Sequence, residues 1–144
     1  MSQTSPTLSQ LVVTLASNDP TNPSGSNSTF TNTFPFSLEL NGKWMISLLS
    51  ITYEPVVVNQ LLFCYISCIY PQITGSFNVN LLWQIAASPV LGTPVTIQQA
   101  EPMQWRLISQ SLLPSIEITI RDGLGNIPAL PTPTIITLLL QRVD

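Results

Sequence analysis

"IEITIRDGLGNIPAL", residues 116–130, contains the clearest strand pattern of the chain and ends in a glycine-rich turn. Isoleucine occupies every second position from Ile116 to Ile120, and polar residues lie between them. Because successive side chains of a strand point to opposite faces, this alternation predicts a strand with one buried face. Asp122 and the glycines after it favour a turn directly behind the strand.

Similar apolar runs recur along the whole chain, and Pro, Gly, Asn and Ser separate them. No window combines helix caps with an apolar stripe at helical spacing, so the pattern is typical of strands. The predicted strands are 11–17, 30–40, 43–53, 61–70, 77–87, 95–100, 103–109, 115–122 and 134–143. About eight or nine strands in this length predict an all-β fold, namely a single jelly roll (an eight-stranded antiparallel β-sandwich) or another Greek-key sandwich.

Two short motifs predict hairpins within this fold. Asn41-Gly42 separates two apolar runs and is the strongest short hairpin signal, so the strands at 30–40 and 43–53 are expected to pair. The segment "GLGN", 123–126, leads toward the last strand. It favours a hairpin turn over a phosphate-binding loop, because such a loop opens a helix.

The 144 residues have room for one domain with one sizeable core. Residues 1–9 are polar and predict a flexible N-terminal arm, so the jelly-roll domain is expected to span 10–144. The N-terminus has neither a basic start nor an apolar stretch, so no secretory signal is expected, and folding inside the cell is predicted.

Charge is scarce in this chain. Charged residues make up 8% of it, hydrophobic residues 44%, and the formal net charge is −3. An ordinary soluble domain has roughly 25% charged residues. Much of the surface is therefore expected to be covered by other subunits, although an aggregation-prone chain has the same composition. Four Lys and Arg residues are too few for a phosphate-binding patch, so nucleic acid is not an expected partner.

The mean hydropathy of +0.34 raises the question of a membrane span. The longest apolar region, 44–71, is interrupted by Glu54-Pro55 and by Asn59-Gln60. The remaining runs are shorter than the roughly 20 residues that a spanning helix needs. No membrane span is expected.

Groups for catalysis are also scarce. The chain contains no His, which excludes Ser-His-Asp and Cys-His mechanisms, and no spacing selects a pair of carboxylates. Cys64 and Cys68 lie too far apart on a strand for a mutual disulfide, so both are predicted to be buried free thiols. We expect no enzyme activity, no catalytic residues, no metal and no cofactor. The sequon Asn27-Ser28-Thr29 is interpreted as chance, because nothing else indicates secretion.

Two groups of residues remain as candidates for a site. Trp44, Trp83 and Trp105 could form a platform for sugars or bases, but single Trp residues in β-rich runs are more often core or interface anchors. Arg121 could pair with a ligand or a neighbour, and Asp122 could bond the backbone of its own turn. For this pair the turn interpretation is favoured.

Three segments together resemble a known family. They are "LELNGKWMISLLSITY" within 37–53, "CYISCIYPQITG" at 64–75, and "IEITIRDGLGNIPAL" with the apolar run that follows it. In this order they are similar to segments of the minor capsid (penton) proteins of Polinton-like viruses, adintoviruses and virophages. The positions that match the family pattern are Gly42, Trp44, Tyr53, Pro71, Gln72, Gly75, Arg121, Asp122, Gly125 and Pro128.

The resemblance implies a single jelly roll without catalytic activity, which forms pentamers at icosahedral vertices beside the major capsid protein. The expected partners are further copies of the chain and the neighbouring major capsid protein, and the expected location is the virion, assembled inside the host cell. The alternatives are a glycan- or receptor-binding β-sandwich head and a capsid cement protein. The candidate turn or subunit-interface residues are Trp44, Tyr53, Gln72, Trp83, Arg121 and Asp122.

Overall fold

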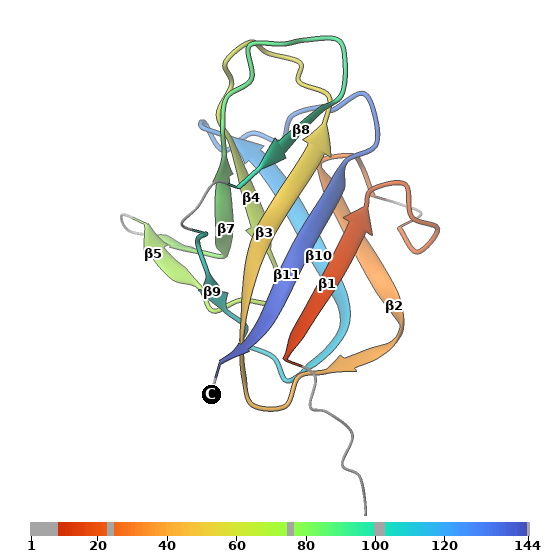
Figure 1. Ribbon diagram of the computed structural model, residues 1–144. Helices are drawn as coiled ribbons and strands as arrows, with labels where there is room; N and C mark the ends of the chain where they lie inside the picture. The colour runs from red at the N-terminus through yellow and green to blue at the C-terminus, as the bar shows by residue number, and fades with distance from the viewer. Residues whose placement is uncertain (1–8, 23–24, 75–76, 100–102, 144) are drawn as a thin grey trace, which may run out of the picture.

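The computed structural model describes residues 9–22, 25–74, 77–99 and 103–143, and within these ranges every regular element is a strand (Figure 1). The strands are β1 (Gln10–Ala16), β2 (Thr29–Glu39), β3 (Lys43–Tyr53), β4 (Leu62–Ile66), β5 (Gln72–Thr74), β6 (Phe77–Val79), β7 (Leu81–Ile85), β8 (Val95–Gln98), β9 (Arg106–Leu107), β10 (Leu112–Asp122) and β11 (Ile135–Val143).

Two antiparallel sheets face each other. One has the order β1-β11-β3-β8, with β9 also paired to β3, and the other has the order β2-β10-β4-β7. The short strands β5 and β6 pair only with each other. Counted along the chain without β5, β6 and β9, the eight main strands give the orders 1-8-3-6 and 2-7-4-5. Nearly every connection therefore crosses from one sheet to the other, which is the topology of a jelly roll. The predicted all-β jelly roll is confirmed.

The core lies between the two sheets and follows the alternation of the sequence. Ile116, Ile118 and Ile120 of β10 have no exposed surface, and residues 117, 119 and 121 face outward on the same strand. Leu138 and Leu140 of β11 point into the core from the opposite sheet and are equally buried. Full burial of one such side chain stabilises the fold by about 1.5–3 kcal/mol. The periodicity of 116–120 therefore sets which face of β10 is inside.

The predicted hairpin at Asn41-Gly42 is wrong. β2 pairs with β10 and β3 pairs with β11, so the two strands lie in different sheets. β2 and β3 each have one apolar face. Because the chain changes sheets at the turn, the apolar face of β2 packs in the sheet opposite that of β3, and both faces are buried between the sheets. Gly42 has a φ of 89°, so the motif supplies the left-handed residue of a corner.

The last two strands do not form a hairpin either, because β10 and β11 belong to different sheets. The turn behind β10 closes on itself: the amide of Asp122 donates to the carbonyl of Asn126 over 2.8 Å, and that of Gly125 donates to the carbonyl of Asp122 over 3.0 Å. Residues 127–134 then cross to the start of β11.

Three predicted strands are shorter than expected. The strand at 61–70 ends at Ile66, so Cys68 lies in the following turn. The strand at 77–87 is divided into β6 and β7, because β6 pairs with β5 and only β7 joins the sheet. The strand at 103–109 is reduced to β9. In each case the apolar composition predicted burial, but the pairing partner sets where the strand ends.

Residues 1–8 of the predicted arm lie outside the described residues. Ser9 is described, and its carbonyl accepts a hydrogen bond of 2.9 Å from the amide of Arg142. Ser9 therefore lies beside β11, next to the start of β1.

Candidate functional site

The loops β3–β4, β7–β8 and β10–β11 lie at one end of the sandwich, at the top of Figure 1, and they carry most of the exposed large apolar side chains. Among the described residues, eight of the fourteen side chains of this kind lie in the loops β3–β4, β7–β8 and β10–β11. We call them the apolar loop end: Val56, Val57, Val58, Leu61, Val90, Leu91, Leu124 and Ile127. When exposed apolar side chains gather in one region of a protein surface, that region usually marks a contact with another molecule.

A backbone hydrogen bond links two of these loops. The amide of Asn59 donates to the carbonyl of Ser88 over 2.8 Å, which ties the β3–β4 loop to the β7–β8 loop. Asn59 has a φ of 56°, a conformation that Asn tolerates better than most residues. The hydroxyl of Ser88 also accepts a bond of 3.2 Å from the amide of Val90. The exposed valines and leucines therefore project from a tied pair of loops.

The Arg121-Asp122 pair holds the third loop. The Arg121 Nη1 donates to the carbonyl of Gly125 over 2.9 Å. The Asp122 Oδ1 accepts bonds of 2.9 Å from the amides of Leu124 and Asn126. Both side chains thus bond the backbone of the turn that follows them. The result is a fixed turn whose tip is Leu124, with 87% of its surface exposed.

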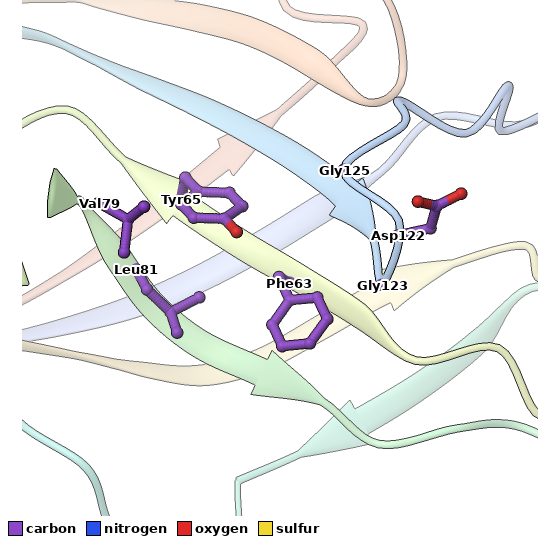
Figure 2. A pocket seen from close by; sticks show the side chains of 7 residues that line it. All are labelled: Phe63, Tyr65, Val79, Leu81, Asp122, Gly123 and Gly125. Carbon is purple, nitrogen blue, oxygen red and sulfur yellow. The ribbon is translucent and has the colours of Figure 1, made fainter. Parts of the chain in front are cut away.

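A groove of about 410 Å³ lies beside this turn, on the outward face of the second sheet (Figure 2). Figure 2 shows the rings of Phe63 and Tyr65 side by side on β4, whereas the carboxylate of Asp122 points away from them. The turn behind β10 forms one wall of the groove. The lining residues are Phe63, Tyr65, Val79, Leu81, Asp122, Gly123 and Gly125. The groove offers an apolar, aromatic floor, and its one carboxylate already bonds backbone amides, so it is equipped for packing and not for acid–base chemistry.

The remaining candidate residues have positions of their own. Trp44 is buried on the inner face of β3, and its Nε1 donates to the carbonyl of Asn41 over 2.9 Å. Tyr53 is buried at the end of β3, and burial raises the pKa of its phenol. Trp83 is half-buried on β7 and packs against the core. Gln72 Nε2 donates to the carbonyl of Leu81 over 2.7 Å and so ties β5 to β7.

Trp105 directly precedes β9, in a separate groove with Met45, Gln141 and Val143. The three Trp residues therefore lie on different elements, with one inside the core. Of the six candidate residues, only Arg121 and Asp122 share a site. Sequence reasoning missed the apolar loop end, although the run Val56-Val57-Val58 between two strands was a visible signal for it.

The two cysteines are buried free thiols, as predicted. Burial raises the pKa of Cys64 and of Cys68 to about 12, so neither forms a thiolate nucleophile near neutral pH. Among the described residues, no group of three or more His, Cys, Asp and Glu could hold a metal ion. A helix long and apolar enough to cross a membrane is likewise absent from the described part of the chain.

The side chain of Asn27, in the sequon, is part of the interior hydrogen bonding of the loops. Its Nδ2 donates to the carbonyl of Leu130 over 2.9 Å, and its Oδ1 accepts a bond of 2.8 Å from the hydroxyl of Ser17. The hydroxyl of Thr134 donates to the carbonyl of Asn27 over 2.6 Å. This amide therefore joins the β1–β2 loop to the β10–β11 connection.

No protein-family model matches the chain, and no curated protein matches it. Two solved structures of the VP2 protein of infectious bursal disease virus resemble it. A mutant VP2 from derived T=1 particles is 14% identical with a TM-score of 0.36, and the match covers 92% of this chain and 32% of VP2. VP2 in the subviral particle is 15% identical with a TM-score of 0.30, and the match covers 91% of this chain and 32% of VP2. The chain thus spans about a third of the length of VP2, and its fold is assigned from its own strand order.

Proposed function

We propose that this chain is a structural virion protein, a minor capsid (penton) subunit that forms a closed ring of five copies at the vertices of an icosahedral double-stranded DNA virus. The observation that carries this proposal is the apolar loop end, with eight exposed aliphatic side chains on three neighbouring loops. Such a surface is stable in water when other subunits cover it. The proposed partners are copies of the same chain and the major capsid protein.

A ring also needs a second contact surface, because each subunit of a cyclic assembly presents two different patches to its neighbours. The outward face of the first sheet offers one. Along this face Val12 pairs with Leu139, and Thr14, Thr137 and Ser50 lie side by side on β1, β11 and β3. All of these side chains are uncharged, so another subunit can cover them without burying an unpaired charge.

The positions that carry the family resemblance also support a structural role. Gly42 forms a corner between the sheets, Trp44 fills the core, and Arg121 with Asp122 fixes the turn behind β10. These residues build the fold and its loops and do not line a cleft with reactive groups. This is expected of a scaffold without enzyme activity.

A glycan- or receptor-binding head is supported less well. Three Trp residues and long polar loops favour such a head, but Trp44 is only 4% exposed. Trp105 precedes β9, which pairs with the first sheet, whereas Trp83 lies on β7 of the second sheet. The capsid role is therefore preferred. A cement protein would differ from a penton in its behaviour alone in solution, since it would bind assembled capsids without forming a ring.

Substitution in the apolar loop end tests the proposal. We expect the double variant Val57→Asp, Val90→Asp to remain folded by circular dichroism and to lose the ring in light scattering, because two buried carboxylates would oppose the contact. Gln84→Glu is the control, since it adds a charge to an exposed site on β7. If the double variant assembled like the unchanged protein, the apolar loop end would have no part in the ring.

A further inference from the structure

The edge strand β2 turns one aromatic side chain away from the core. Its pairing with β10 is interrupted at residues 34–37, which oppose Pro114 alone, and a proline has no amide hydrogen to give to the ladder. Phe34 and Leu38 still pack against the core, whereas Phe36 between them keeps 71% of its surface exposed. Bulges at sheet edges re-aim side chains in this way. The irregular pairing thus presents the ring of Phe36 to the outside.

The edge of β2 beside Phe36 is closed to a further strand. Three of its backbone amides donate to side chains of the β1–β2 loop, each over 3.0 Å. The donors are Thr29, Thr31 and Thr33, and the acceptors are Ser26, Asn22 and Thr21. The next position in this series is Pro35, which has no amide hydrogen. A partner at this edge therefore contacts side chains, and Phe36 is the large apolar side chain that β2 exposes.

The groove beside the turn of 123–126 lies on the other side of the same sheet. β2 is one edge of the order β2-β10-β4-β7, whereas the floor of the groove is formed on β4 and β7 (Figure 1). Its volume of about 410 Å³ is within the range of pockets that hold a small molecule, so one aromatic side chain fits. The turn that forms its wall also carries Leu124, so the groove is continuous with the apolar loop end.

We propose that Phe36 of one copy of the chain occupies the groove of the next copy in the ring. This inference rests on the proposed function, because the second copy belongs to that ring. The rings of Phe63 and Tyr65 lie side by side in the groove (Figure 2). Aromatic rings attract each other in offset-stacked and edge-to-face arrangements, so a third ring is a matching occupant.

The contact buries no unpaired charge. Phe36 lies between Pro35 and Ser37, which are both uncharged. The carboxylate of Asp122 in the groove wall already accepts bonds from two amides of its own turn. Apolar and aromatic surfaces therefore meet without the desolvation of a free charge, which is the costly term in burial.

The positions of the two surfaces select a head-to-tail contact. Phe36 and the groove lie on opposite sides of one sheet, so a copy that receives a neighbour's ring in its groove presents its own Phe36 on the other side. Such a contact joins two different patches of the same chain and closes into a ring when the rotation between copies allows it. A two-fold pair would instead bring identical patches together.

Photocrosslinking from position 36 tests the placement. We expect Phe36→p-benzoylphenylalanine to link, on irradiation, to groove peptides that contain Phe63 or Tyr65. Mixtures of isotope-labelled and unlabelled chains, analysed by mass spectrometry, should show that the two peptides come from different copies. The control is the same amino acid at Gln98, an exposed position on β8 of the first sheet, and it should give no link to the groove.

The outcomes separate this contact from the ring itself. Native mass spectrometry of the unchanged chain counts the copies. Five copies per particle without links from position 36 to the groove would overturn the contact and leave the ring in place. A strictly monomeric chain would overturn both. Links confined to particles of two copies would replace the ring with a two-fold contact.

A pair of serine variants measures the strength of the contact. We expect Phe36→Ser to raise the concentration at which half of the rings dissociate by about tenfold or more, because buried aromatic anchors dominate subunit contacts. Tyr65→Ser added to Phe36→Ser should change it little further, since residues in contact are not additive. Leu112→Ser, also at an exposed apolar position, is the control and should have a smaller effect. Equal dissociation of Phe36→Ser and the unchanged protein would contradict the placement.

Discussion

Asp122 illustrates how a residue that looks reactive in the sequence acts as part of a turn. Its Oδ1 accepts bonds of 2.9 Å from the amides of Leu124 and Asn126, while Arg121 bonds the carbonyl of Gly125. The pair could be predicted as a turn from the glycines that follow it. Which amides Asp122 bonds could not be predicted, because that choice depends on the backbone path of residues 123–126.

We expect Asp122→Ala to lower the free energy of unfolding by about 1–2 kcal/mol, since the turn loses two bonds to a charged acceptor at once. Urea unfolding measures this change. Asp122→Asn keeps one acceptor oxygen and should lose less. Equal stability of Asp122→Ala and the unchanged protein would remove the turn-fixing role of the carboxylate.

The buried thiols make stability depend on alkaline pH. Their pKa is raised to about 12 in the folded protein, from an ordinary value of 9.0. Between these two values the unfolded chain loses protons that the folded chain keeps, so stability is full below pH 9 and falls as pH rises toward 12. The expected slope is roughly 1.4 kcal/mol per pH unit for each thiol.

Chemical denaturation at several pH values from neutral to alkaline measures this slope. The raised pKa of buried Tyr53 acts in the same direction. A double variant Cys64→Ala, Cys68→Ala should lose the contribution of the two thiols and keep that of Tyr53. Rapid reaction of the folded protein with a thiol reagent near pH 8 would contradict the burial of both cysteines.

At the scale of elements, the corner at Gly42 connects the two sheets. A Cβ added there would lie 3.1 Å from the Nε of Arg142, and the φ of 89° is unfavourable for any residue with a side chain. We expect Gly42→Ala to cost about 1–2 kcal/mol of stability in thermal or urea unfolding. Gly123→Ala is the matched control, because its Cβ would come no closer than 4.0 Å to Phe63. A Gly42→Ala cost no larger than that of the control would mean that the corner does not require glycine.

The elements could be predicted to different degrees. The alternation in 116–120 gave the buried face of β10, because burial follows directly from periodicity. The motif Asn41-Gly42 correctly predicted that the chain reverses direction, but the predicted hairpin was wrong. Local turn chemistry does not specify which sheet receives the next strand. Partners such as β10 and β2 are separated by dozens of residues, and no local pattern in the sequence encodes their pairing.

At the scale of the whole molecule, the jelly roll could be expected from the periodicity of the sequence. Of the apolar loop end, only the run Val56-Val57-Val58 was visible in the sequence, and its gathering with the other loops was not. The apolar loop end forms only when the fold brings the loops at 54–61, 86–94 and 123–134 to the same end of the sandwich. Of these loops, 54–61 and 86–94 are joined by the bond between Asn59 and Ser88. The proposal of a subunit contact therefore rests on an arrangement that is visible only in three dimensions.

The stoichiometry of the purified protein tests the central claim most directly. Native mass spectrometry of the unchanged chain at micromolar concentration, with class averages from electron microscopy, should give five copies per particle and a five-fold ring. The same particles should persist on dilution as a discrete species. A strictly monomeric protein under these conditions, or a two-fold dimer, would contradict the account.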